Sequence, residues 1–373
     1  MDRDSAIKKR GKIYGIDIIR ILACVSVYTH HYLRMELEPA MDGFNAFRSS
    51  SLFRYLLGVF GAEYAVIAFF VIAGFFMSYN TRTESLRPLE YGKKCAYKCM
   101  NIIIPSFLVI TATALIALPL KIAGMADIFS IRDYFLDLFK LTVGIQGDKH
   151  IHYAYPLWFQ HFIFTGYISG YIFLYVFRKD RRIRLAAYFP ALIYLLFNSE
   201  YTFMVFMGML AGELCEGEYE KRLRKIFGNV FLNILFMIML SSGMSMVIRE
   251  NYDSPQIYGP ATLLFVLLLL TVYCMSKAEE GKKYKIIDFL SSNSYSCYLI
   301  HFFLMCSLMR IVYRIFRHTS LPGRNNTLFC AVMYIIMTIS LWILGYIFNK
   351  YVLKPLKRSY DRIWSETEVR LTR

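Results

Sequence analysis

The segment from Ile13 to Leu33 reads IYGIDIIRILACVSVYTHHYL and decides the fold class of the chain. It is almost continuously apolar, and as a helix rising 1.5 Å per residue it is long enough to cross the ~30 Å hydrocarbon core of a bilayer. No small-x-small cleavage site follows it, so we expect a signal-anchor helix that is retained in the mature protein.

The rest of the chain has the same apolar character. Of its 373 residues, 57% are hydrophobic, 17% are aromatic and 19% are charged, and the mean hydropathy is +0.41. A soluble protein of this size usually has about a quarter charged residues and somewhat under half apolar ones. The composition therefore argues against a soluble globular enzyme and against disorder, and it predicts a protein that crosses a bilayer many times.

Ten apolar stretches are predicted to be membrane-spanning helices, which gives an all-α bundle of about ten transmembrane helices. They are Ile13–Leu33, Leu56–Tyr79, Ile102–Leu120, Leu157–Phe177, Leu185–Phe197, Tyr201–Leu214, Val230–Ile248, Ile257–Met275, Ile287–Met309 and Leu328–Phe348. The fifth and sixth stretches are short and are separated only by residues 198–200, so they could instead form one long helix.

The positions of the basic residues decide between these alternatives. With ten spans and the N-terminus inside, 30 of the 43 Lys and Arg residues lie on the inner side and 12 on the outer side, whereas merging the fifth and sixth spans gives 20 and 22. The positive-inside rule therefore favours ten spans with both termini cytoplasmic. The net charge of +16 then reflects topology, and no nucleic-acid partner is expected.

The predicted topology also gives the domain organisation. Residues 1–355 are expected to form one transmembrane domain, and residues 356–373 a short basic cytoplasmic tail. The eight cysteines are scattered, mostly in apolar spans. Cys95 and Cys99 fall in a predicted cytoplasmic loop without partner Cys or His spacing, so we interpret them as packing residues and predict no metal site.

The first span carries charged residues, which are costly inside a bilayer and indicate function by default. Arg20 and His31 are eleven residues apart, which is only about 20° from three full helical turns, so they share one face about 16 Å apart along the axis. Asp17 lies on the same face and can pair with Arg20, whereas His30 points about 100° away. An alternative is an Asp–Arg pair that anchors helix packing and a histidine at the membrane interface.

Other ionisable residues in predicted spans are Glu63, His161, Glu213, Asp288 and His301. Glu213 and Asp288 lie near the cytoplasmic ends of their spans, where their carboxylates can reach the membrane surface. His301 lies in the middle of its span, where it serves function or is a buried, hydrogen-bonded packing residue.

Three stretches resemble motifs of the membrane acyltransferase family 3. The first is YGIDIIR at residues 14–20, which is followed by ten residues and His31, as in the Asp-x-x-Arg and Arg-x10-His patterns of that family. The second is FFVIAGFF at residues 69–76, which is similar to Phe-Phe-x-x-Ser-Gly-Phe with Ala73 in place of the serine. The third is SYSCYLIH at residues 294–301, which is similar to Ser-Tyr-x-x-Tyr-Leu-x-His.

Two weaker matches are PLWF at residues 156–159 and Phe203-x2-Phe206-x-Gly208. The matches run from residue 14 to about residue 310 in the order of the family, and ten spans also suit it.

One departure from the family lies in the basic segment before the third span. The family usually has Arg-x-x-Arg just ahead of a proline, where this chain has Lys98 and Asn101 before Pro105. Lys98 keeps the positive charge without the two-pronged geometry of a guanidinium group, and Asn101 keeps only hydrogen bonding. Lys93 and Lys94 can supply additional positive charge.

The resemblance implies transfer of an acyl group, usually acetyl, from acyl-CoA to a carbohydrate hydroxyl, with no permanently bound cofactor. It implies catalytic roles for Asp17, Arg20 and His31. An imidazole with an ordinary pKa of ~6.5 can act as a base or carry the acyl group. The positive charge of Lys93, Lys94 and Lys98, together with Asn101, would bind coenzyme A on the cytoplasmic side.

Residues expected near the acceptor or along the path to it complete the predicted site. They are Glu63, Trp158, Tyr295, Ser296 and His301. Trp158 is either a sugar-stacking platform or a residue of the aromatic belt. Glu63 either orients His31 or is an interfacial carboxylate, and Tyr295 and Ser296 are expected to make structural hydrogen bonds.

The main hypothesis is thus an O-acyltransferase of a bacterial-type plasma membrane that acts on a cell-envelope or exopolysaccharide glycan or a lipid-linked saccharide. A multi-pass transporter or exporter would show similar charges within its spans. The Arg20–His31 pair, the basic segment before the third span and the lack of a detectable inverted repeat favour the enzyme. A third hypothesis is a membrane sensing or binding module.

Overall fold

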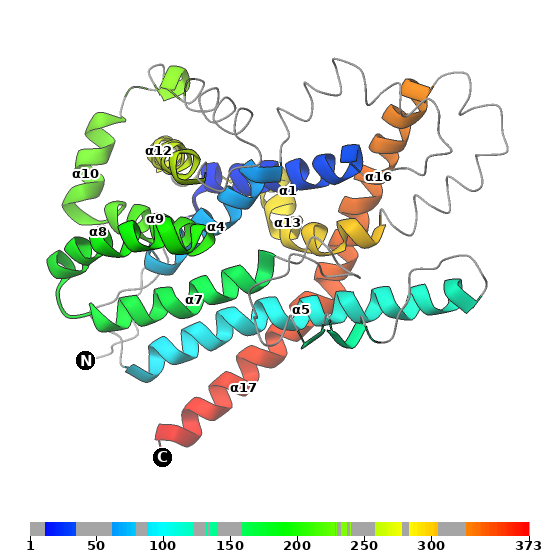
Figure 1. Ribbon diagram of the computed structural model, residues 1–373, viewed down its shortest axis with the longest axis horizontal. Coiled ribbons are helices and arrows are strands. Elements are labelled where there is room, and N and C mark those ends of the chain that lie inside the picture. Colours follow the sequence, from blue (N-terminus) through cyan, green and yellow to red (C-terminus); the bar gives the residue numbers. More distant parts are fainter. Residues whose placement is uncertain are drawn as a thin grey trace.

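A computed structural model describes residues 12–34, 62–79, 88–122, 132, 134–136, 138–139, 159–227, 229, 233–236, 239, 258–277, 283–304 and 326–372. All regular secondary structure in these residues is helical (Figure 1), which confirms the all-α prediction.

The helices follow the predicted apolar stretches. They are α1 (Tyr14–Arg34), α4 (Ala62–Tyr79), α5 (Pro88–Ile122), α7 (Phe159–Val176), α8 (Arg181–Asn198), α9 (Glu200–Leu214), α10 (Gly217–Ile226), α12 (Tyr258–Lys277), α13 (Lys285–Leu304), α16 (Asn326–Phe348), the π-helical segment η6 (Asn349–Leu353) and α17 (Lys354–Thr372). Most of the predicted stretch Val230–Ile248 lies outside the described residues.

The fifth and sixth apolar stretches form two helices, as the charge count predicts. α8 begins after Asp180, whose carboxylate accepts hydrogen bonds from the backbone N–H groups of Arg182 and Ile183 and so caps the helix. α8 ends at Asn198, and the non-helical backbone of Ser199 (φ −160°, ψ 88°) separates it from α9. The two helices then pack against each other, which excludes one long helix.

Three described helical segments are long and apolar enough to cross a membrane by themselves: Pro88–Leu115, Tyr258–Ser276 and Ala331–Ile363. Shorter apolar helices are Tyr64–Tyr79 and Phe162–Val176. These segments support a membrane protein, while the number of ten spans and the cytoplasmic termini stay predictions.

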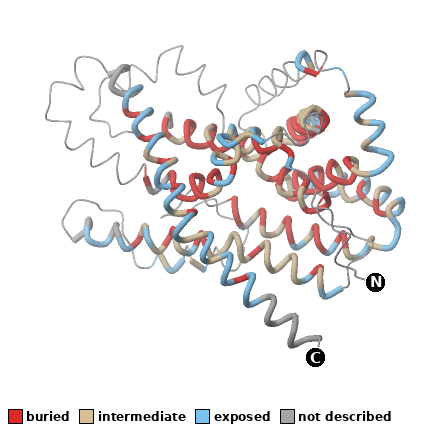
Figure 2. Tube along the Cα trace, turned by 180° about the vertical axis from the view of Figure 1, so that it is seen from behind, coloured by how far each residue is buried: buried red, intermediate tan, exposed pale blue. Residues whose placement is uncertain are grey.

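Large apolar side chains on the outer helices face away from the protein, as a lipid environment favours. Phe189 and Phe197 on α8 are 71% and 81% exposed, and one face of α16 exposes Ile335, Ile339 and Ile343. In Figure 2 buried residues concentrate in the helices at the centre, whereas much of α16 and α17 is exposed.

Two segments predicted as loops are helical. α5 begins at Pro88, so the basic segment before the third span forms the first turns of that helix, and α10 lies within the predicted loop of residues 215–229. Hydropathy identifies only the apolar part of a helix and therefore misses polar turns. In α10 these turns are supported by ion pairs at helical spacing, Glu218–Lys221 and Glu220–Arg224.

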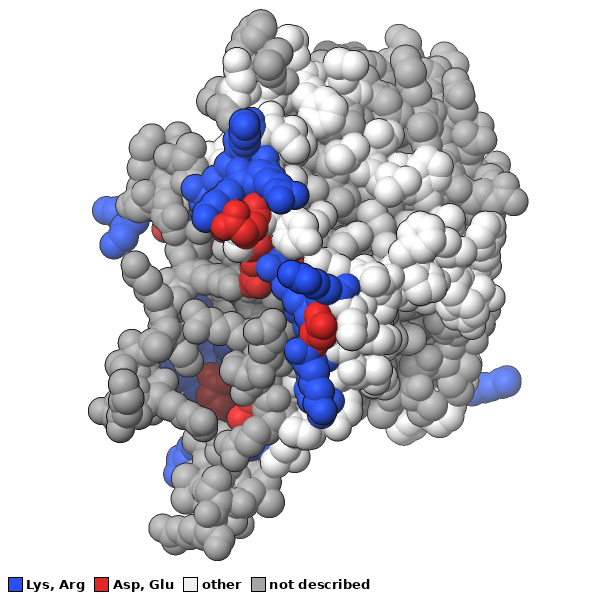
Figure 3. Space-filling model, turned by 90° about the vertical axis from the view of Figure 1, so that its left-hand side faces the viewer, with Lys and Arg blue, Asp and Glu red and all other residues white. Residues whose placement is uncertain are grey.

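The charged groups on one side of the molecule form a band. α8 and α10 lie on this side in Figure 1, and Figure 3 shows it face on, with Lys, Arg, Asp and Glu gathered beside a broad described surface that carries none of them. α10 buries no residue, so its charges contribute to this surface.

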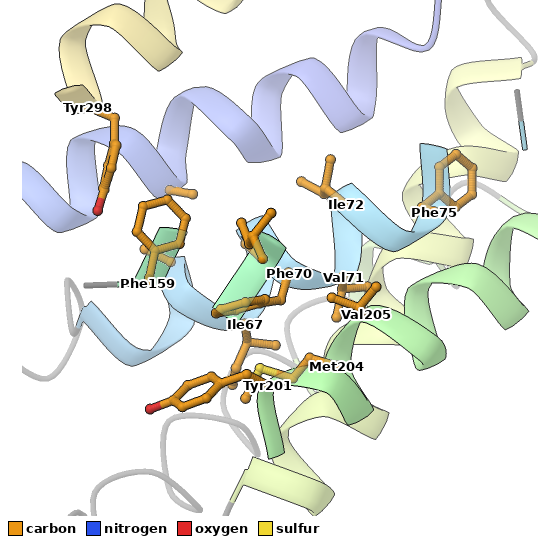
Figure 4. Packing of buried hydrophobic residues seen from close by; sticks show 14 of the residues in the cluster. Ile67, Phe70, Val71, Ile72, Phe75, Phe159, Tyr201, Met204, Val205 and Tyr298 are labelled. Carbon is orange, nitrogen blue, oxygen red and sulfur yellow. The ribbon is translucent and has the colours of Figure 1, made fainter. Parts of the chain in front are cut away.

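The centre of the core is the contact between α4 and α9. Gly74 on α4 faces the backbone of Val205, and Gly208 on α9 faces the backbone of Val71, so that a Cβ atom at either glycine would collide with main chain. Figure 4 shows Val71 and Val205 at this contact. Both glycines belong to stretches that the sequence singled out, and their small size brings the two helices close together.

Candidate active site

The predicted charged face of α1 packs against α13, and a buried serine joins the two helices. The hydroxyl of Ser291 donates a hydrogen bond to Asp17 Oδ1 at 2.5 Å. Arg20 Nη1 lies 3.4 Å from the same carboxylate oxygen and 3.4 Å from Ser291 Oγ. The Arg20 guanidinium also lies over the ring of Phe76 on α4, 5.7 Å from its centroid. Asp17 thus holds Arg20 in a fixed position.

At the start of α1, Lys12 continues this charged network. Its ammonium group lies 3.5 Å from Asp17 Oδ2 and pairs with Asp288 on α13. Partial burial lowers the pKa of Lys12, but the hydrogen bond to Asp288 and the negative charges of Asp17 and Asp288 outweigh this effect and raise the pKa above its ordinary value. Asp288 therefore fastens α13 to the first residues before α1.

At the other end of the same face, His31 lies beside His301 of α13. The ring centroids are 5.3 Å apart and the ring planes are inclined by 33°. His301 is 1% exposed, and its Nδ1 is 2.5 Å from the carbonyl oxygen of Tyr298. A carbonyl only accepts, so Nδ1 carries the proton and Nε2 is left as an acceptor. Nε2 is buried and has no hydrogen-bond partner in the described part of the chain.

His30 differs from its neighbour in its surroundings. It is buried, whereas His31 is half-buried, and the two rings meet edge to face with centroids 5.6 Å apart. Of these two histidines, His31 is the one whose ring contacts His301 in the described part of the chain. The structure therefore brings together the two histidines that the first and third sequence motifs predict.

A cluster of aromatic side chains adjoins His301 of the histidine pair. The ring of Tyr298 lies 5.4 Å from that of His301, 4.7 Å from Phe159 on α7 and 5.4 Å from Phe69 on α4. Figure 4 shows Tyr298 and Phe159 next to each other. These contacts connect α4, α7 and α13 around the site.

A group of cations lies at the opposite end, near Arg20. Lys94 and Lys98 are one turn apart on α5, and the positive charges of Arg20, Lys94 and Lys357 of α17 are all close enough to Lys98 to interact with its ammonium group. No acidic group acts on Lys98 within the described residues. Such a convergence of like charges favours an anionic ligand.

Lys357 is a residue that the sequence analysis missed. The hydroxyl of Tyr97 on α5 donates a hydrogen bond to Asp361 Oδ1 on α17 at 3.0 Å, which holds α17 beside the basic turns of α5. Figure 1 shows the two helices crossing. The net charge of the tail does not indicate which of its basic residues meets α5, although those residues are the available signal in the sequence.

The remaining predicted site residues on α5 and α13 make structural bonds. Asn101 donates from Nδ2 to the carbonyl oxygen of Tyr97 at 2.9 Å, and Tyr295 donates from its hydroxyl to the carbonyl oxygen of Asn101 at 3.2 Å. Ser296 donates to the carbonyl oxygen of Asn293 within α13. Tyr295 thus joins α13 to α5 near the cation group.

Several predicted residues cannot be placed relative to this site. Trp158 lies outside the described residues, as do the side chains of Glu63 in the first turn of α4 and His161 in α7. Lys93 is half-buried on α5, next to Lys94.

Glu213 does not reach the membrane surface as predicted. It is 3% exposed, and its two carboxylate oxygens accept hydrogen bonds of 2.6 and 3.1 Å from Arg184. The predicted spans place Arg184 in a loop, whereas it lies within α8 and is also buried. Burial of both charges is possible because they pair in a two-pronged geometry.

The chain matches one protein-family model. The family model described as an acyltransferase domain matches residues 13–347, which is nearly the whole chain. No curated protein and no solved structure matches it.

Proposed function

The chain belongs to the membrane acyltransferase family 3, and from this premise we propose that it transfers an acetyl group from acetyl-CoA to a hydroxyl of a cell-envelope or exopolysaccharide glycan. Membership of the family establishes a membrane acyltransferase in general. The donor, the acceptor and the acyl group are our proposals.

The observation that carries the proposal is the arrangement of two chemically different ends along one helix face. Arg20 lies at the cation group and His31 at the histidine pair, eleven residues or about 16 Å apart along α1. An acyl-CoA molecule has the same two ends, with phosphates at one and the thioester at the other. The distance between the ends suits a donor that spans part of the membrane.

In this proposal Lys94, Lys98 and Lys357 bind the phosphates of coenzyme A, and Arg20 adds positive charge at the inner end of the path. Lys357 supplies a charge from a different helix, and in this way it compensates for the missing Arg-x-x-Arg pattern. Lys93 and Asn101 lie on the same part of α5 and complete the donor side.

The transfer itself would take place at the histidine pair. An imidazole nitrogen of His31 removes the proton from the acceptor hydroxyl while the hydroxyl oxygen attacks the thioester carbonyl carbon. The C–S bond then breaks, and the departing sulfur takes the proton from His31, so that coenzyme A leaves as a thiol. His301, whose Nε2 can only accept, receives a hydrogen bond from a second hydroxyl of the acceptor and positions it.

We further propose that the protein resides in a bacterial-type plasma membrane, with the donor on the cytoplasmic side and the glycan on the outer side. Glu63 and Trp158 would contact the acceptor near His31. Tyr295 and Ser296 would support the donor path through their helix contacts.

The test is mass spectrometry of surface glycans from cells with and without this protein, with the His31→Ala variant as the matched control for expression. We expect the loss of one acyl mass in the deletion strain and in the variant. Glycans that keep the same acyl masses in all three strains would contradict the proposed acceptor.

A further inference from the structure

Gln160 on α7 is a buried amide that the reaction described above does not use. Gln160 is 1% exposed, and its Oε1 accepts a hydrogen bond from the hydroxyl of Ser106 on α5. Its Nε2, which can donate two hydrogen bonds, has no partner in the described part of the chain. A buried donor without an acceptor is costly, so its retention calls for an explanation.

Gln160 lies between the cation group and the histidine pair. On α7 it precedes Tyr167 by seven residues, which places both on one face about 10 Å apart along the axis, and Tyr167 interacts electrostatically with Arg20. The residue before Gln160 is Phe159, whose ring contacts Tyr298 next to His301.

Ser106, the partner of Gln160 on α5, lies at a similar distance from the cation group. Ser106 follows Lys98 by eight residues, or about 12 Å along the helix. Ser106 and Gln160 therefore lie at similar distances from the cation group, measured along α5 and α7, on the outer side of that group. The two helices pack against each other, so α5 and α7 give two separate measures of where this hydrogen bond lies along the helices.

We propose that Gln160 Nε2 donates a hydrogen bond to an amide carbonyl oxygen of the pantetheine arm when acyl-CoA is bound. The proposal rests on the proposed function. Between its phosphates and its thioester, this arm carries amide groups in an otherwise apolar chain, and a carbonyl oxygen is the acceptor that an unpaired amide N–H requires. When the single hydroxyl proton of Ser106 points to Gln160 Oε1 rather than to the carbonyl oxygen of Ile102, it occupies Oε1 and leaves Nε2 for the ligand.

The experiment compares two acetyl donors with the purified full chain in detergent, with acetyl-CoA as one donor and S-acetyl-2-mercaptoethanol, which has no amide, as the other. Gln160→Met keeps a similar volume without donors. We expect it to raise KM for acetyl-CoA roughly 3- to 10-fold, the effect of one lost hydrogen bond, with little change in kcat. For the amide-free donor we expect kcat/KM to be unchanged.

The outcomes are separable from those of the proposed function. Equal losses with both donors would overturn the inference, because Gln160 would then act on the thioester or on the fold, and so would an unchanged KM for acetyl-CoA. A wild-type protein that uses neither donor would overturn the proposed function itself. If Gln160→Met does not accumulate, Ser106→Ala tests the same amide, with a smaller rise of KM expected for acetyl-CoA alone.

Discussion

His31 on α1 and His301 on α13 face each other with ring centroids 5.3 Å apart, although 270 residues separate them in the chain. One histidine keeps some exposure and the other is fully buried with its Nδ1 bound to a backbone carbonyl. The pair thus combines a side chain that can reach a substrate with a side chain that is held in one orientation.

From this pair we predict that His31→Ala abolishes acyl transfer, while His30→Ala keeps most of it. General acid–base catalysis is typically worth 10²–10⁴ in rate, so the loss is measurable in any glycan acylation assay. The adjacent residues lie at nearly the same depth, which makes His30→Ala a control for insertion and polarity. Equal activities of the two variants at equal expression would contradict a catalytic role of His31.

We predict that His301→Phe lowers activity mainly by raising KM for the glycan acceptor. The variant keeps an aromatic ring but has no acceptor in place of Nε2, whose orientation the bond from Nδ1 to the Tyr298 carbonyl fixes. Loss of one hydrogen bond corresponds to about 1 kcal/mol, or roughly a 5-fold change. The measurement is steady-state kinetics with varied acceptor at saturating donor, and a rise of KM for acyl-CoA instead would place His301 on the donor path.

The cation group leads to a prediction about donor binding. Replacing Lys93, Lys94 and Lys98 together by Ala should raise KM for acetyl-CoA by about 5- to 30-fold, because about 1–2 kcal/mol of charge attraction is lost. Lys357→Ala should raise it less. The wild-type KM should itself rise with salt, since partly exposed charges are screened. Lys225→Ala on α10 is the control, and an unchanged KM in the triple variant would show that the donor binds elsewhere.

The positions of the helices could be predicted because hydropathy and charge are local properties of the sequence. The face shared by Asp17, Arg20 and His31 followed in the same way from helical geometry. The partner Ser291 of Asp17 and the approach of Lys357 to Lys98 could not be predicted, because they arise only through the packing of helices that are distant in the sequence. Ser291 lies one turn before the motif at residues 294–301, which is the signal that a search for polar neighbours would use.

The close contact of α4 and α9 gives a stability prediction. Gly208→Ala places a Cβ against the backbone of Val71 and should cost about 1–3 kcal/mol through overpacking. At Gly92 on α5 a Cβ meets nothing within 4 Å, so Gly92→Ala should be neutral or stabilising by about 0.5–1 kcal/mol. Thermal unfolding in detergent measures both, and equal midpoints for the two variants would contradict the packing argument.

The buried ion pair gives a second stability prediction. Arg184→Met leaves the carboxylate of Glu213 buried beside a weaker partner, Arg181, at 3.5 Å, and should destabilise the protein by about 3–5 kcal/mol. Adding Glu213→Gln should recover part of this loss, because the uncompensated charge is removed. Arg182→Met, at an exposed neighbouring position, is the control. A double variant as unstable as the single variant would show that packing of the guanidinium, rather than charge, matters.

The last prediction concerns the sides of the membrane. Cysteines introduced by Asn198→Cys, at the end of α8, and by Lys225→Cys, in α10, replace exposed residues on opposite sides of one predicted span. In intact cells a membrane-impermeant maleimide should label the first and not the second, and permeabilised cells should show labelling of both above the wild-type background.

A reporter fused after Arg373 should read as cytoplasmic, and it leaves the Tyr97–Asp361 hydrogen bond in place. External labelling of Lys225→Cys would reverse the sides of the later helices, and an external reporter would put Lys357 away from the coenzyme A pool and so exclude its proposed role.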